Sequence, residues 1–197
     1  GSGMEVCTVG GYNEVGGNMT AVKVGDDVIL IDMGINLQAL LDYEDEEGRR
    51  NLSADQMIKI GAIPNDKKIK HWRKNVRAII LGHCHLDHIA AVPYLAAKYR
   101  CPIYGSPFTI AVLNSILRDD KVQLPNKVKA IALNKVVKIN NNLQFELVNV
   151  THSTLQAAMV ALHTKDGVML YASDWKFDNH PVLGPKPNYK RLRELGK

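Results

Sequence analysis

Four side chains that commonly bind metal ions lie within six consecutive positions of this 197-residue sequence. Residues 82–88 read Gly-His-Cys-His-Leu-Asp-His and come directly after an apolar run. Side chains alternate along an extended strand end, so His83 and His85 project to the same side and can share one ion. Asp87 and His88 follow where the chain turns into a helix, and they can face a second ion. This pattern predicts an open catalytic zinc site, although the same ligands also accept manganese.

Two later residues extend the candidate metal site. His152 follows a predicted strand at 143–150, and Asp174 follows another at 168–172. Taken singly, each is as well explained as an ordinary loop residue. Taken with the cluster at 83–88, each lies just after the end of a predicted strand, as His83 does. A sheet can bring residues in such positions together at one edge. His152 then completes a three-histidine set, and the Asp174 carboxylate can bridge both ions.

Several polar residues are candidates for supporting roles. Asp32 ends a strand predicted at 28–31 and can accept the N–H of a ligand histidine, with a plain turn aspartate as the equal alternative. Ser153 and Thr154 carry hydroxyls that can contact a phosphate or cap a turn. Residues 67–74 include five Lys or Arg, which can bind backbone phosphates or form a solvated face. Further basic candidates are Lys186, Lys190, Arg191 and Arg193.

Hydrophobic patterning and turn residues predict the elements that position these side chains. Helices are predicted at 53–60, 89–99 and 107–118, whereas the acidic and then basic stretch 42–50 is interpreted as a solvated loop. The predicted strands are 5–9, 19–24, 28–31, 76–81, 103–104, 127–133, 136–139, 143–150, 157–163 and 168–172. Their order indicates an α/β layered domain built on mixed sheets, not an alternating Rossmann unit.

Composition excludes several classes of protein. Apolar residues make up 46% and charged residues 23%, a globular balance rather than a disordered one. No apolar run approaches the roughly 20 residues that span a bilayer, and no signal-peptide pattern opens the chain. Three cysteines without a C-x-x-C pair suit a reducing cytosol, so we expect a cytoplasmic protein with no membrane contact. The net charge of +5 is compatible with a polyanionic partner. Residues 1–3 are interpreted as an expression scar and are left out of the fold prediction.

The sequence resembles the metallo-β-lactamase superfamily at motifs named above: H-x-H-x-D-H at 83–88, His152, Asp174 and Leu-Ile-Asp-Met-Gly at 30–34. More narrowly, it is similar to the archaeal type of ribonuclease J, within the β-CASP group. The stretches that carry this narrower resemblance are Gly-Gly-Tyr-Asn-Glu-Val-Gly-Gly-Asn-Met at 10–19, His-Ile-Ala-Ala-Val-Pro-Tyr-Leu at 88–95, Ser-Asp-Trp-Lys-Phe-Asp at 173–178, Pro-Val-Leu-Gly at 181–184 and Arg-Leu-Arg-Glu-Leu-Gly at 191–196.

This resemblance implies a metallo-β-lactamase αββα fold, an α+β sandwich of the α/β class, with two zinc ions. The implied ligands are His83, His85 and His152 for one zinc, Asp87 and His88 for the other, and Asp174 between them. It also implies zinc-dependent hydrolysis of RNA as a 5′-to-3′ exonuclease, with added endonuclease activity left open, and with Asp87, Asp174 and His152 as catalytic residues. The diiron flavoprotein branch carries glutamate where this chain has His85, so histidine there favours zinc over iron.

The chain departs from the family at one place. Such enzymes insert a β-CASP domain and then return to complete the lactamase fold, whereas this chain ends at Lys197. We therefore expect residues 4–180 to form an incomplete N-terminal part of the lactamase domain, and 181–197 to lead toward an absent β-CASP domain. The expected partners are RNA and the remaining β-CASP and C-terminal lactamase segments, with a homodimer left open. The chain alone is expected to be weakly active or inactive.

Two other functions stay open at the level of sequence. One keeps the metals but hydrolyses a thioester, lactone or β-lactam, because two metals and an activated water do not choose between phosphate and acyl carbon. The other is a non-catalytic scaffold that binds zinc or RNA. Salt-dependent affinity for RNA favours the nuclease. Hydrolysis of a lactone or glutathione thioester favours the first rival, and binding without cleavage favours the second.

Overall fold

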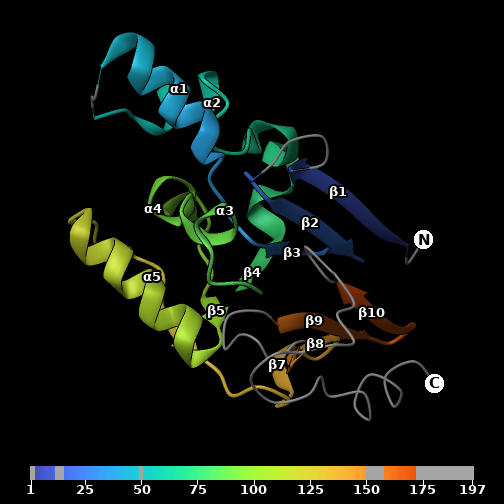
Figure 1. The fold of residues 1–197 in the computed structure, drawn as a ribbon. Helices are drawn as coiled ribbons and strands as arrows, with labels where there is room; N and C mark the ends of the chain where they lie inside the picture. Colours follow the sequence, from blue (N-terminus) through green and yellow to red (C-terminus); the bar gives the residue numbers. More distant parts are fainter. Residues whose placement is uncertain (1–2, 12–15, 49–50, 150–157, 172–197) are drawn as a thin grey trace, which may run out of the picture.

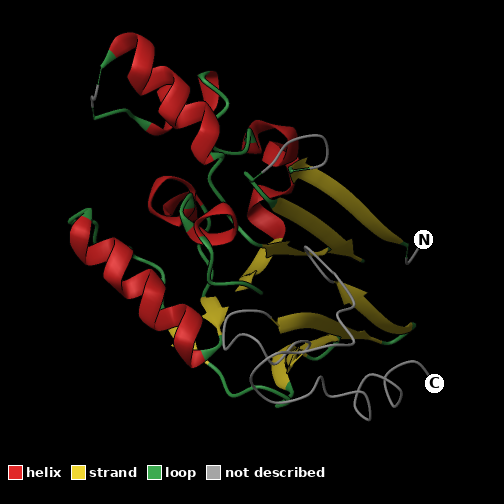
Figure 2. Cartoon of the chain, viewed as in Figure 1, coloured by secondary structure: helices red, strands yellow, loops and turns green. Residues whose placement is uncertain are grey.

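Two β-sheets pack against each other in the computed structural model, which describes residues 3–11, 16–48, 51–149 and 158–171 (Figure 1). The first sheet has six strands in the order β1-β2-β3-β4-β5-β6, and the second has four in the order β10-β9-β8-β7. Helices cover the face of the first sheet that points away from the second sheet (Figure 2). The described residues therefore form helix, sheet and sheet layers, which agrees with the mixed α/β class predicted from the sequence.

The first sheet changes from antiparallel to parallel at its centre. Strands β1 (Met4–Gly10), β2 (Met19–Val24) and β3 (Asp27–Ile31) are joined antiparallel. The strands that continue the sheet parallel to β3 are β4 (Val76–Leu81), β5 (Ile103–Gly105) and β6 (Val128–Ala130). Because parallel neighbours end on the same side, β3 to β6 all deliver their following residues to one border of the sheet, which we call the carboxyl edge.

The second sheet is antiparallel throughout. Its strands are β7 (Val137–Asn140), β8 (Leu143–Asn149), β9 (Ala158–Thr164) and β10 (Gly167–Tyr171). At the carboxyl edge, the backbone N–H of Ala158 donates to the carbonyl of Gly82 at 2.7 Å. This bond joins the start of β9 to the residue that follows β4, so the two sheets meet beside the candidate metal cluster.

Helical segments of very different lengths form the outer layer. They are α1 (Leu37–Glu47), α2 (Ala54–Lys59), the 3-10 helix η1 (Asp66–Asn75), α3 (Leu86–Ile89), α4 (Val92–Leu95), the 3-10 turn η2 (Ala96–Lys98) and α5 (Pro107–Asp119). None of the described helices combines the length and apolar character that crossing a bilayer requires.

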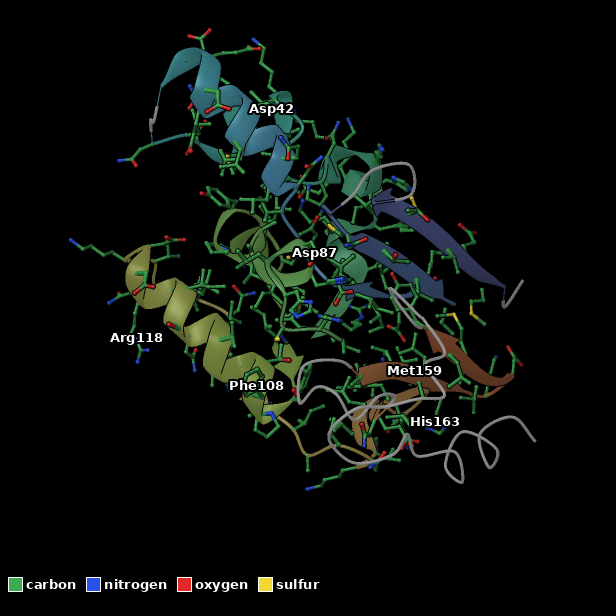
Figure 3. All side chains as sticks on the ribbon, in the orientation of Figure 1. Asp42, Asp87, Phe108, Arg118, Met159 and His163 are labelled. Atoms are coloured by element: carbon green, nitrogen blue, oxygen red, sulfur yellow. The ribbon has the colours of Figure 1, made fainter. Side chains whose placement is uncertain are left out.

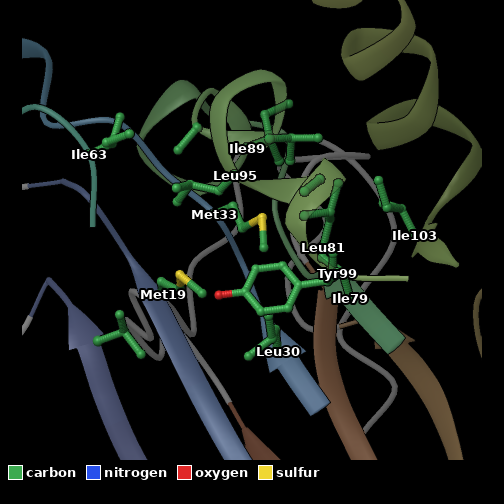
Figure 4. Close-up of a cluster of buried hydrophobic side chains, with 14 of the residues drawn as sticks. Met19, Leu30, Met33, Ile63, Ile79, Leu81, Ile89, Leu95, Tyr99 and Ile103 are labelled. Atoms are coloured by element: carbon green, nitrogen blue, oxygen red, sulfur yellow. The ribbon is translucent and has the colours of Figure 1, made fainter. Parts of the chain in front are cut away.

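Each face of the first sheet buries its own hydrophobic core. Leu30 and Ile79 face the helices, where they pack with Tyr99 and Leu95 (Figure 4). Their sequence neighbours on β3 and β4 point the other way and pack against the second sheet. Strands covered on both faces need apolar residues at every position, which explains why 28–31 and 78–81 are continuous rather than alternating apolar runs.

Two predictions of local structure are wrong. Residues 42–50 were expected to form a solvated loop, but most of them belong to α1, whose N-terminus is capped by the Asn36 side chain accepting from the Ala39 N–H at 3.1 Å. Residues 89–99 were expected to form one helix, but they divide among α3, α4 and η2. Pro93 stands at the start of α4 and lacks the N–H that would bond the carbonyl of Ile89 in a continuous helix.

The remaining element predictions are confirmed in kind: the strands predicted at 19–24 and 76–81 have the predicted bounds, and other elements have shifted bounds. The helices predicted at 53–60 and 107–118 appear as α2 and α5, and the predicted strands all appear. The strand predicted at 127–133 is shorter, because β6 ends at Ala130 and the chain leaves the first sheet there. Residues 67–74, for which no element was predicted, lie within η1.

Candidate metal centre

The candidate metal centre lies at the carboxyl edge, immediately after two adjacent parallel strands. Asp32 follows β3, and the segment 82–88 follows β4. Asp87 lies in α3, where the helical layer meets the sheets. Met159 and His163 lie on β9 of the second sheet, farther from the helical layer (Figure 3). The parallel pairing of β3 and β4 is therefore what brings Asp32 beside a segment that is 50 residues distant in the sequence.

Three imidazole rings lie against one another in this segment. The ring centroids of His83 and His85 are 4.2 Å apart, and those of His83 and His88 are 4.5 Å apart with the rings stacked. The ligand atoms of His83, Cys84 and His85 all lie within 4.8 Å of one another. Zinc binds imidazole nitrogen at about 2 Å, so ligands of one ion lie roughly 3–4 Å apart, close to the separation found in this group.

Burial keeps the histidine at the centre of the cluster neutral. Burial, the largest cause, and the neighbouring His88 and His85 together lower the pKa of His83 to about 4. Neutral imidazole is the form that binds a metal ion. Cys84, which lies between the two histidines, was not predicted as a ligand. Burial raises the pKa of its thiol, so the nitrogen donors are the ones ready to bind.

Asp32 contacts both the backbone and a predicted ligand of the cluster. The side chain is fully buried, and its Oδ1 accepts from the Gly82 N–H at 2.9 Å. Its Oδ2 lies 2.9 Å from Nδ1 of His88. The other ring nitrogen of His88, Nε2, lies 3.4 Å from Oδ2 of Asp87. The carboxylate of Asp32 thus fixes the His88 ring with Nε2 on the side of Asp87, as expected of a residue that orients a metal ligand.

A second backbone segment holds residues 86–88 in place. The Met33 N–H donates to the His88 carbonyl at 2.7 Å, and the Ile35 N–H donates to the Leu86 carbonyl at 3.0 Å. Between them, Asn18 donates from its backbone N–H and its side-chain amide to the Asp87 carbonyl, at 3.1 and 3.0 Å. The backbone of Asp87 and His88 is thereby fixed before any ion binds.

Sequence reasoning did not assign a role to Asn18 or to Gly34. A Cβ built on Gly34 would lie 1.5 Å from the Asp87 carbonyl oxygen, so only glycine allows this approach. Both residues belong to stretches that carried the family resemblance, at 10–19 and 30–34. That membership was the available signal, but the contact with Asp87 depends on strand pairing that the spacing does not reveal.

Gly34→Ala should therefore disrupt the candidate metal centre, although Gly34 itself is not a predicted metal ligand. We expect the free energy of unfolding to fall by about 3 kcal/mol, because the new methyl group must displace the backbone of Asp87. Zinc content should fall with it. Thermal unfolding and elemental analysis measure the two effects. Gly25→Ala is the control, since a Cβ there meets nothing within 4 Å and its φ of 60° should cost only about 1 kcal/mol. Equal stability of the two variants would contradict the close packing at Gly34.

The predicted site residues divide into two groups. His83, His85, Asp87 and His88 are brought together at the carboxyl edge, and Asp32 lies against His88. His152, Ser153, Thr154 and Asp174 lie outside the described residues, as do the basic residues beyond 185. Their flanking strands are described: Asn149 pairs with Ala158, and the Tyr171 hydroxyl lies 2.9 Å from the Thr20 hydroxyl of β2.

A model of the metallo-beta-lactamase superfamily matches residues 12–186. The chain belongs to this superfamily. Its fold implies binding of divalent metal ions, typically zinc, and the histidine and carboxylate donors at the carboxyl edge fit such ions. The expectation of a metallo-β-lactamase fold is thus confirmed, and the site lies where two parallel strands end.

Relatives with curated names are similar over nearly the whole chain. Ribonuclease J of Pyrococcus abyssi is 43% identical over 196 residues, which is 98% of this chain and 43% of that protein. Ribonuclease J of Methanocaldococcus jannaschii is 40% identical over 195 residues, again 98% of this chain and 43% of that protein. The chain thus spans less than half the length of these relatives.

Solved structures with low sequence identity share the fold. A protein of unknown function from Enterococcus faecalis superposes with a TM-score of 0.64 and 21% identity, over 87% of this chain and 43% of that one. Unliganded yeast PDE1 superposes with a TM-score of 0.58 and 17% identity, over 91% of this chain and 67% of that one. At these identities the similarity supports the fold alone.

Proposed function

We propose that this chain is the N-terminal, metal-binding part of a ribonuclease J-like enzyme that hydrolyses RNA phosphodiesters with a two-metal-activated water. One combination carries this proposal: His83, His85, Asp87 and His88 gather at the carboxyl edge of a chain that is 43% identical to an archaeal ribonuclease J. Zinc as the resident ion, 5′-to-3′ exonuclease activity and a cytoplasmic location belong to the same proposal.

The proposed ligands form two groups. His83, His85 and His152 would hold one ion, Asp87 and His88 would hold the other, and Asp174 would serve both. Two bound divalent ions lower the pKa of a water molecule and polarise the phosphodiester. Asp32 keeps the His88 ring oriented through Nδ1, and Asn18 and Gly34 keep Asp87 in place through its backbone. The Asp87 carboxylate orients the attacking water, and the Ser153 and Thr154 hydroxyls contact the phosphate.

A cleavage assay with competing substrates tests this function. RNA carrying a 5′-monophosphate is incubated with the zinc-loaded chain, and with a longer protein that also contains the β-CASP and C-terminal lactamase segments. We expect release of mononucleotides by the longer protein and weak or no release by the chain alone, because the relatives use more than twice this length. His83→Ala in the longer protein should abolish release. Hydrolysis of a lactone or glutathione thioester without RNA cleavage would reject the nuclease, and RNA binding without any hydrolysis would support the scaffold.

A further inference from the structure

A cavity opens where the edge strands of the two sheets adjoin. Its volume is about 580 Å³, and its described walls are Tyr104 of β5, residues 129–132 at the end of β6, and residues 135–138 at the start of β7. We call it the corner pocket. It lies outside the metal cluster, and neither the sequence motifs nor the site described above accounts for it.

Positive charge dominates the corner pocket. Lys129, Lys135 and Lys138 line it with exposed side chains, and its described walls include no aspartate or glutamate. The ion pairs found among the described residues do not involve these lysines. The ammonium of Lys129 lies 5.7 Å from the centre of the Tyr104 ring. Three unneutralised ammonium groups around one cavity favour a ligand with several negative charges.

The corner pocket lies on the same border of the fold as the metal cluster. Gly105 of β5 pairs with Leu81, which is two residues before His83, and Ala130 of β6 pairs with Gly105. The chain then crosses between sheets at this border, since the Ile131 N–H donates to the Gly105 carbonyl and the Asn134 N–H to the Leu147 carbonyl. Strands β4 and β6 are two positions apart, which corresponds to about 10 Å.

The basic segment 67–74 identified from the sequence has a different position. It lies in η1, which ends at Asn75. The Asn75 side chain donates to the carbonyl of Asp26, in the turn between β2 and β3. That turn is at the border opposite the carboxyl edge, so the C-terminal end of η1 lies away from the border that holds the metal cluster and the corner pocket.

We propose that the corner pocket binds backbone phosphates of the RNA strand whose scissile phosphodiester lies at the metal cluster. Lys129, Lys135 and Lys138 contact phosphates a short distance along the strand and hold it in line with the carboxyl edge. This assignment rests on RNA being the substrate. It adds to that function a specific binding surface, formed by the crossing of the chain from the first sheet to the second.

Charge removal with a matched control tests the corner pocket. One variant of the longer protein carries Lys129→Gln, Lys135→Gln and Lys138→Gln. The control variant carries Lys59→Gln, Lys127→Gln and Lys165→Gln, which removes the same charge from exposed positions outside the corner pocket. Binding of a labelled single-stranded RNA with non-hydrolysable linkages is measured across a salt series. Circular dichroism confirms that both variants fold.

Each phosphate contact contributes about 0.7 to the slope of log affinity against log salt for a single strand. We expect the corner variant to lose about 2 in slope and about 100-fold in affinity near 0.1 M salt, with the control slope unchanged. Equal losses in both variants would overturn the corner pocket and leave RNA as the substrate. Absence of salt-dependent RNA binding by the wild-type longer protein would overturn both. Preferential loss of poly-glutamate binding, with RNA binding retained, would assign the pocket to an acidic protein and overturn its role with RNA.

Discussion

His83→Ala should remove about one equivalent of zinc from the purified chain. His83 lies at the centre of the cluster, with its ring against both His85 and His88, so its loss opens the cluster on two sides. We expect the affinity for the first ion to fall by more than the roughly 10- to 100-fold that loss of an outer hydrogen-bond partner costs. Elemental analysis after dialysis measures the stoichiometry, and competition with a chromophoric chelator measures the affinity.

His71→Ala provides the comparison for this zinc measurement. His71 is an exposed histidine of η1 whose ring contacts Trp72, far from the carboxyl edge. It should keep the zinc content of the wild type. If His83→Ala keeps that content as well, the ligand set is wrong. If the wild-type chain folds but holds no zinc, then His83, His85, Asp87 and His88 do not suffice without segments beyond this chain.

The sequence was sufficient to predict that the candidate ligands His83 and His85 lie side by side, because their spacing follows from strand geometry. His83 and His85 are separated by two residues after a continuous apolar run, and the structure places their rings side by side after β4. Asp32 was assigned a supporting role from its position after another apolar run. Its contact with His88 required the parallel pairing of β3 and β4, which links residues 56 positions apart.

Other features could not be predicted because they depend on tertiary contacts rather than on local pattern. The acidic helix α1 has no buried residue, so hydrophobic periodicity did not reveal it, and its cap at Asn36 was overlooked. The close approach of Gly34 to Asp87 needs a loop from β3 to lie along α3. The corner pocket likewise forms only because β6 ends at Ala130 and the chain crosses to the second sheet, whereas a longer strand was predicted there.

Asp32→Ala should cost more stability than any other single change proposed for this site. It leaves the Gly82 N–H and Nδ1 of His88 without a carboxylate in a fully buried position. Each buried donor left without its acceptor costs about 1–3 kcal/mol of the free energy of unfolding, and this change affects two of them. The backbone adds to this loss, because Asp32 has a φ of 65°, a conformation that aspartate tolerates better than alanine. Thermal and denaturant unfolding measure the change.

Asp32→Asn separates the orienting role of this side chain from its structural role. The amide keeps the shape of the carboxylate but offers one oxygen and one NH2 group, whereas Gly82 and His88 both require an acceptor. If the oxygen serves Gly82, the NH2 group faces Nδ1 of His88 and moves the ring proton to Nε2, the nitrogen on the side of Asp87. We therefore expect zinc affinity at the second ion to fall about 10- to 100-fold, with a smaller loss of stability than in Asp32→Ala.

Asp27→Asn is the matched control on the same strand. Asp27 begins β3 at the opposite border and pairs with Arg77 at 2.8 Å, where partial exposure makes the ion pair worth less than about 1 kcal/mol. Its replacement should leave zinc affinity unchanged. If Asp32→Asn also leaves zinc affinity unchanged, the Asp32 carboxylate serves only to join β3 to β4, and His88 is oriented by other contacts. A selective loss in Asp32→Asn would instead link the second ion to the parallel pairing that brings Asp32 and His88 together.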